Sequence, residues 1–241
     1  MNNGALRFAR YAYPPNALGY CGPGDCGALL EYADAGVADG GLTDLARRFA
    51  GAWPYLALIG AATGHPDPLD DRVVEAYWLG NPLLERVPGR LLAANLDDRF
   101  ARRAGRGFAD LATLAIGGGR AHHNFHVFAV YPWVGMLRAG FTVEPLRVLN
   151  YCRVRWGTVV SVHNGGSAEV VSAPLIWQGD RLALGPQAPE TVALSASQAS
   201  QVRPGDVVSL HWGWVCEPLN GVQTRRLRHY TTTQLNLVNL R

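Results

Sequence analysis

The chain has 241 residues, of which 48% are hydrophobic, 17% charged and 10% aromatic, and this composition excludes a disordered or fibrous protein. The formal net charge is only +3, so the overall charge does not favour binding to nucleic acid or to an anionic membrane. No apolar run approaches the roughly 20 residues that a membrane-spanning helix needs. The first residues also lack the pattern of a secretion signal. We therefore expect a cytoplasmic protein.

Residues 25 to 140 have the apolar spacing of helices, interrupted by turns rich in glycine and proline. Asx or threonine caps precede several of these segments, and Gly80 ends one of them. Pro132 should kink the last segment, because proline removes a helical hydrogen bond. The expected helices cover residues 25–33, 43–50, 70–80, 96–114 (one or two helices) and 121–138.

From Leu149 onward the apolar period changes to two, which predicts strands. Asn164-Gly165-Gly166 is a strong hairpin signal, and Gly179-Asp180 and residues 203–206 predict further turns. Residues 223–240 are amphipathic and predict a final helix that covers the sheet. We therefore predict an α+β protein in which an all-α helical domain (1–148) precedes a small β-barrel domain (149–241), which is OB-like and has a terminal helix. Each part has an ordinary domain size, and about 90 residues can bury a core of their own.

Two segments of the second part carry a resemblance to a known family. The first is Cys152-Arg-Val-Arg-Trp-Gly-Thr-Val, which opens the expected barrel, and the second is Pro204-Gly-Asp-Val-Val-Ser-Leu-His211-Trp-Gly-Trp-Val-Cys. Together they resemble the HypC/HupF chaperones that assemble the iron centre of nickel–iron hydrogenases, over residues 150–238. Residues 1–148 resemble only uncharacterised bacterial proteins.

The resemblance to HypC/HupF implies a HypC-like barrel that holds an iron with CO and cyanide ligands. It implies that Cys152 and His211 bind this iron, and that the partners are the hydrogenase large subunit or other maturation proteins. A thiolate and an imidazole on neighbouring strands also suit a soft, low-spin ferrous ion. If both side chains are only structural, Cys152 is a packed thiol and His211 a hydrogen-bonded core histidine.

Three of the seven histidines form the pattern His122-His123-x-x-His126 at the start of an expected helix. His122 and His126 are four residues apart and share a helical face, and His123 and His126 are also close enough to converge. With a further ligand they would bind iron, zinc or nickel, which would make a second metal site. The alternative is a polar helix start in which the imidazoles cap backbone groups.

In a reducing compartment the four cysteines are expected to be thiols or metal ligands, not disulfides. Cys21 lies in a turn and Cys26 in the first turn of a helix, where the helix dipole lowers the pKa of a thiol. Both are candidate metal ligands, although their spacing does not encode a complete site. Cys216 is expected to be a packed core thiol.

These observations lead to two main hypotheses about function. In the first, the chain is a hydrogenase maturation protein whose barrel carries or delivers an iron–CO/cyanide group. In the second, it is a metal-dependent enzyme whose helical part generates a diatomic ligand, such as CO, for that iron. A nucleic-acid-binding barrel is a third hypothesis, and the low net charge counts against it.

Overall fold

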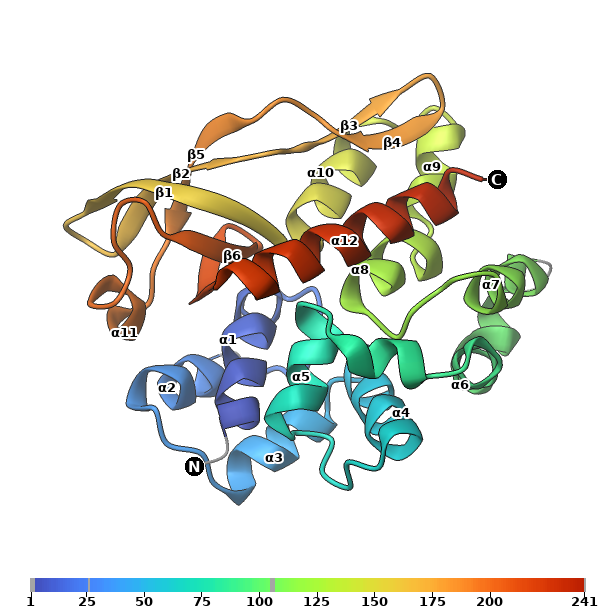
Figure 1. The fold of residues 1–241 in the computed structure, drawn as a ribbon, viewed down its shortest axis with the longest axis horizontal. Helices are drawn as coiled ribbons and strands as arrows, with labels where there is room; N and C mark the ends of the chain where they lie inside the picture. The colour runs from blue at the N-terminus through green and yellow to red at the C-terminus, as the bar shows by residue number, and fades with distance from the viewer. Residues whose placement is uncertain (1–2, 26, 105–106, 241) are drawn as a thin grey trace.

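The computed structural model describes residues 3–25, 27–104 and 107–240, and it is a mixed α+β fold (Figure 1). Helices occupy the chain up to residue 152, strands follow, and a long helix ends the fold. Among these residues, no helix combines the length and the apolar character that crossing a membrane requires.

The helices that precede the sheet are mostly short and are separated by turns. Asp70 caps α5 by accepting a hydrogen bond from the Arg72 N–H, as the sequence predicts. Helix α3 begins before the predicted Thr43, because Asp39 provides the cap. The helices are α1 (Asn3–Ala17), α2 (Ala28–Ala35), α3 (Gly40–Arg47), α4 (Trp53–Thr63), α5 (Asp71–Trp78), η1 (Pro82–Arg86), α6 (Gly89–Ala104), α7 (Gly107–Ile116), α8 (His123–Phe125), η2 (His126–Val130), α9 (Trp133–Arg138) and α10 (Val143–Cys152).

The apolar segment predicted as one kinked helix, 121–138, is divided into three pieces. Helix α8 has a single turn and leads into η2, which is a turn of π-helix. Pro132 then precedes α9. The chain is thus interrupted at the predicted residue, Pro132, but it forms separate helices there and not the single kinked helix that was predicted, and the π turn is not visible in the sequence. Such turns occur frequently at functional sites.

Five strands form a sheet that closes on itself in the order β1-β2-β5-β7-β6, and β3 and β4 form a separate hairpin. Closure arises because β1 pairs with both β2 and β6. The predicted hairpin at Asn164-Gly165-Gly166 joins β1 to β2, and both glycines have positive φ. The elements are β1 (Arg155–His163), β2 (Ser167–Ser172), β3 (Leu175–Gln178), β4 (Arg181–Leu184), β5 (Ala188–Ala193), α11 (Ala196–Ala199), β6 (Val207–His211), β7 (Trp214–Pro218) and α12 (Gly221–Val238).

The helices and the sheet pack directly on one another. Helix α1 contacts β6 and β7, and α12, the predicted terminal helix, contacts β1, α8 and η2. One hydrophobic cluster contains side chains from both parts of the chain, among them Phe8, Leu149 and Cys216. A second, smaller cluster lies inside the barrel. Helix α10 runs through residue 148, and the division of the chain into two domains there stays a prediction.

Candidate metal centre

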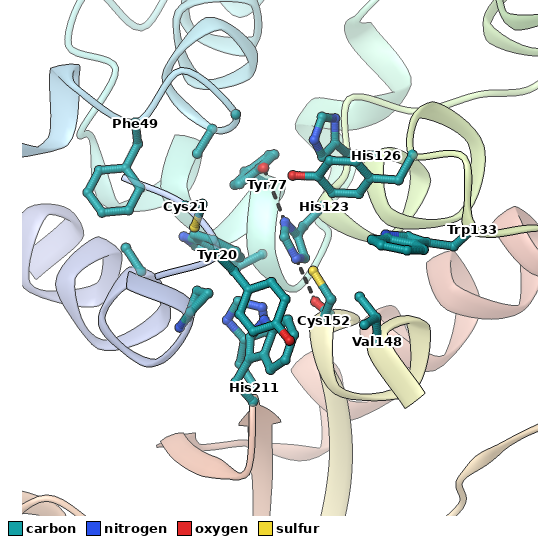
Figure 2. A pocket seen from close by; sticks show the side chains of 17 residues that line it. Tyr20, Cys21, Phe49, Tyr77, His123, His126, Trp133, Val148, Cys152 and His211 are labelled. Atoms are coloured by element: carbon teal, nitrogen blue, oxygen red, sulfur yellow. Dashed lines mark hydrogen bonds between the residues drawn. The ribbon is translucent and has the colours of Figure 1, made fainter. Parts of the chain in front are cut away.

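A cavity of about 130 Å³ lies where α1, α5, η2, α10 and the end of β6 meet (Figure 2). Its wall is mainly apolar and aromatic. The aromatic side chains in the wall are Tyr20, Phe49, Tyr77, Trp78, Tyr131, Trp133 and Trp212.

Three potential metal ligands converge at this cavity: His123, Cys152 and His211. Each offers one ligand atom, and these atoms all lie within 4.8 Å of one another. The side chains point towards one another from three elements, namely the start of α8, the end of α10 and the end of β6 (Figure 2). The group thus combines the predicted Cys152–His211 pair with one member of the predicted histidine cluster.

The prediction that Cys152 lies on a strand is wrong. Cys152 is the last residue of helix α10, and β1 begins only at Arg155. The alternation of apolar residues that predicted the strand starts at the same place in the sequence, but helix α10 continues to Cys152 before the chain becomes extended. The thiol therefore reaches the cavity from a helix end, and only His211 reaches it from a strand.

His211 has one ring nitrogen in a hydrogen bond and the other without one. Nδ1 lies 2.7 Å from the backbone oxygen of Tyr11, and because a carbonyl can only accept, Nδ1 carries the proton. Nε2 is buried and makes no well-aligned hydrogen bond among the described residues, although the Cys152 backbone is near enough to oppose the lowering of the His211 pKa. A buried imidazole with one nitrogen oriented by a carbonyl and the other unpartnered has the arrangement of a metal ligand.

Helix α1 holds the strand that carries His211. The Tyr11 hydroxyl donates to a Glu217 carboxylate oxygen at 2.9 Å and lies 2.7 Å from the Ser209 hydroxyl. Arg7 donates to the same carboxylate at 3.0 Å. Tyr11 therefore fixes β6 and β7 through its side chain and orients the imidazole through its carbonyl.

His123 is hydrogen-bonded through both ring nitrogens. Nε2 lies 2.8 Å from the Cys152 backbone oxygen, and Nδ1 lies 3.2 Å from the Tyr77 hydroxyl. Because the carbonyl accepts, the proton is on Nε2 and the tyrosine hydroxyl donates to Nδ1. The next residue, Asn124, exchanges two hydrogen bonds with the Val154 backbone, at 2.8 and 2.9 Å. These bonds fix the position of α8 relative to the end of α10.

Burial keeps the three candidate ligands uncharged near neutral pH. It lowers the pKa of His211 to about 4 and holds the pKa of His123 well below its usual value. It raises the pKa of the Cys152 thiol to about 12, an effect that the neighbouring Trp212 indole opposes. A metal cation that binds here meets two neutral imidazoles and displaces the proton of one thiol.

Two of the other predicted ligands line the same cavity outside the group of three. His126 places Nδ1 2.9 Å from the Tyr55 hydroxyl, and burial lowers its pKa to about 3. Cys21 is half-buried in the cavity wall, and burial raises its pKa to about 12.

His122, another predicted ligand, neither lines the cavity nor belongs to the group of three. His122 is the N-cap of α8: its Nδ1 accepts a hydrogen bond from the Asn124 N–H at 3.1 Å, which matches the capping alternative. Cys216 is fully buried in the hydrophobic core, as expected of a packed thiol. Cys26 lies outside the described residues.

Sequence reasoning missed Tyr11, Tyr77 and Trp212. Tyr11 belongs to α1, which was not predicted and which contains Pro14 and Pro15. Tyr77 lies in a predicted helix, but nothing in the sequence marks its hydroxyl as a histidine partner. Trp212 follows His211 and has a φ of 50°, which is rare for a bulky residue and places the indole against Tyr20. Of these three residues, only Trp212 had a signal in the sequence, because it is an aromatic residue directly after the candidate ligand His211.

Comparison with known proteins gives a family but no function. The whole chain, residues 1–241, matches the sequence profile of a family of unknown function, DUF6390. No curated protein and no solved structure matches the chain. The resemblance of residues 150–238 to the HypC/HupF chaperones stays a prediction. The chain belongs to the DUF6390 family.

Proposed function

We propose that the chain binds one transition-metal ion through His123, Cys152 and His211. We further propose that this ion is iron with CO and cyanide ligands, which the protein carries during the maturation of nickel–iron hydrogenases.

The observation that carries the metal proposal is the state of His211 together with its place in the group of three potential ligands, since His122 also has an unpartnered Nε2 within the described part of the chain but lies outside that group. The His211 Nε2 is buried without a hydrogen-bond partner among the described residues, which costs free energy in a merely structural histidine. A metal ion would remove this cost. The ligand atoms of Cys152 and His123 lie close enough to bind the same ion.

The ligand set and the cavity favour a soft or borderline metal ion with additional small ligands. A thiolate and two imidazoles suit iron, zinc or copper better than magnesium or calcium. Three protein ligands leave coordination positions open. The cavity of about 130 Å³ exceeds the roughly 10–15 Å³ that one water molecule needs by this measure, so several diatomic ligands would fit.

The hydrogenase role rests on the resemblance to HypC/HupF. In that family the opening cysteine and the strand histidine hold the iron group, and they correspond to Cys152 and His211. The proximity of these two side chains supports the correspondence. The proposed partners are the hydrogenase large subunit or other maturation proteins.

A metal-dependent enzyme that generates a diatomic ligand, such as CO, is the second candidate. It is favoured by Cys21 and Tyr131, which lie in the wall of the same cavity and would be available to a bound substrate. Because His123 belongs to the group of three, this enzyme would use the same metal as the carrier and would not need a second site.

Iron analysis combined with infrared spectroscopy tests the proposed function. Protein purified without oxygen from cells that contain the hydrogenase maturation proteins should hold about one iron and show bands of iron-bound CO and cyanide. Cys152→Ala and His211→Ala should each lose both signals. The matched controls Cys216→Ala, a buried thiol that does not line the cavity, and His163→Ala, an exposed histidine, should keep them.

The same experiment separates the two candidates. A carrier gains the bands only when the other maturation proteins are present, whereas an enzyme that makes CO would show a CO band without them. Full iron loading of both Cys152→Ala and His211→Ala would contradict the proposed site.

A further inference from the structure

We propose that Tyr77 is a positioning residue that allows His123 to change its tautomer when the metal binds. This inference rests on the proposed metal site and adds a residue that does not itself touch the ion. Two hydrogen bonds, one at each ring nitrogen, hold the His123 ring.

The two hydrogen bonds of the His123 ring place its proton on the nitrogen that a metal would need. Nε2 donates to the Cys152 carbonyl at 2.8 Å, and this end of the ring lies beside the Cys152 sulfur (Figure 2). Nδ1 is at the other end of the ring, where it accepts from the Tyr77 hydroxyl at 3.2 Å. The lone pair of His123 therefore faces Tyr77, while the site lies on the protonated side.

Metal binding through Nε2 requires the ring proton to move to Nδ1. The ring stays neutral, so His123 neither gains nor loses a proton overall. The Nε2–H bond to the Cys152 carbonyl is broken, and the new Nδ1–H needs an acceptor. The only proton that leaves the site is that of the Cys152 thiol.

The Tyr77 hydroxyl is suited to this change because a hydroxyl can donate or accept. It donates to Nδ1 before the metal binds and, after rotation about its C–O bond, accepts from Nδ1–H. A carbonyl at this position could serve only the second state. The hydroxyl is fully buried with its ring, so water does not substitute for it readily.

A neighbouring pair in the same part of the fold provides a matched control. Tyr55 is also fully buried, its ring stacks on that of Tyr77 at 5.6 Å, and its hydroxyl lies 2.9 Å from Nδ1 of His126. His126 lies outside the group of three potential ligands. Tyr55→Phe therefore removes the same atom from the same kind of pair without affecting the proposed switch.

The test measures Zn²⁺ affinity of the full-length protein and the tautomer of His123 by ¹⁵N NMR. Wild type should show Nε2–H in the free protein and Nδ1–H in the zinc-bound protein. Tyr77→Phe should weaken zinc binding by about 10- to 100-fold, the usual effect of losing a partner of a metal-bound histidine. Tyr55→Phe should keep the wild-type affinity.

Each outcome has a distinct meaning. Wild-type zinc affinity in Tyr77→Phe, or a proton that stays on Nε2 in the zinc-bound wild type, would overturn the inference and leave the proposed site intact. Equal losses in Tyr77→Phe and Tyr55→Phe would also overturn it, because they indicate a general disturbance of packing. Absence of zinc binding in the wild type would overturn both proposals. If Tyr77→Phe does not fold, the tautomer in the zinc-bound wild type decides.

Discussion

Individual histidines in this chain are buried without charge, and this makes the stability of the fold sensitive to acid. Burial lowers the pKa of His122 from 6.5 to about 3. The unfolded chain therefore takes up a proton near pH 6.5, whereas the folded chain does so only near pH 3. The contribution of each such histidine to the free energy of unfolding is fully present above about pH 6.5. Below that pH the free energy of unfolding falls by up to about 1.4 kcal/mol per pH unit for each such histidine.

Substitution of His122 tests this sensitivity at one residue. Asn is a good N-cap and can accept the Asn124 N–H as the imidazole does, but it does not titrate. His122→Asn should therefore lose less unfolding free energy than the wild type between pH 6.5 and 4, as measured by urea denaturation of the metal-free protein. The exposed control His163→Asn should follow the wild type. An identical acid slope for His122→Asn would mean that His122 is not buried as described.

Among the elements, the single turn of α8 carries the candidate ligand His123 and connects it to the end of α10 and to α12. Asn124 bonds to the Val154 backbone just after α10, and its amide also donates to the Thr231 hydroxyl on α12 at 2.8 Å. The position of His123 relative to Cys152 therefore depends on this buried asparagine as well as on the hydrogen bond between His123 Nε2 and the Cys152 carbonyl.

Removing this asparagine should affect both stability and metal binding. Asn124→Ala leaves the Val154 N–H and C=O without their partner, at a cost of about 1–3 kcal/mol for each. Thermal denaturation should show the loss, and zinc affinity should fall because α8, which carries His123, is held less firmly at the end of α10. Asn164→Ala, in the exposed β1–β2 turn, should bind zinc normally. Normal zinc affinity in Asn124→Ala would show that the ligands are positioned in another way.

The elements that were predicted correctly are those that a few consecutive residues in the sequence indicate. The Asn164-Gly165-Gly166 hairpin depends on backbone conformations that glycine adopts readily, and the helix after Asp70 depends on its cap. The candidate site has no such signal. His123, Cys152 and His211 are far apart in the sequence, and they converge because α1 packs against β6 and β7 while α10 packs against η2. Sequence reasoning identified all three residues but assigned them to two separate sites.

Over the whole molecule, the hydrophobic cluster shared by the helices and the sheet has a consequence for unfolding. Because Phe8 of α1 and Cys216 of β7 belong to one cluster, we expect a single cooperative thermal transition, with helix signals and tryptophan fluorescence changing together. Zinc should raise the midpoint of this one transition, since it binds only the folded chain. Two separate transitions, of which zinc shifts only one, would instead support independent domains at 1–148 and 149–241.

The central claim is that one imidazole from α8, one thiolate from α10 and one imidazole from β6 bind the same ion. X-ray absorption at the zinc edge of the full-length protein, loaded with one equivalent of zinc, tests it most directly. The account predicts one sulfur at about 2.3 Å and two imidazole nitrogens at about 2.0–2.1 Å. The sulfur signal should disappear in Cys152→Ala and remain in Cys216→Ala. A zinc ion without sulfur, or one that keeps its sulfur in Cys152→Ala, would contradict the account.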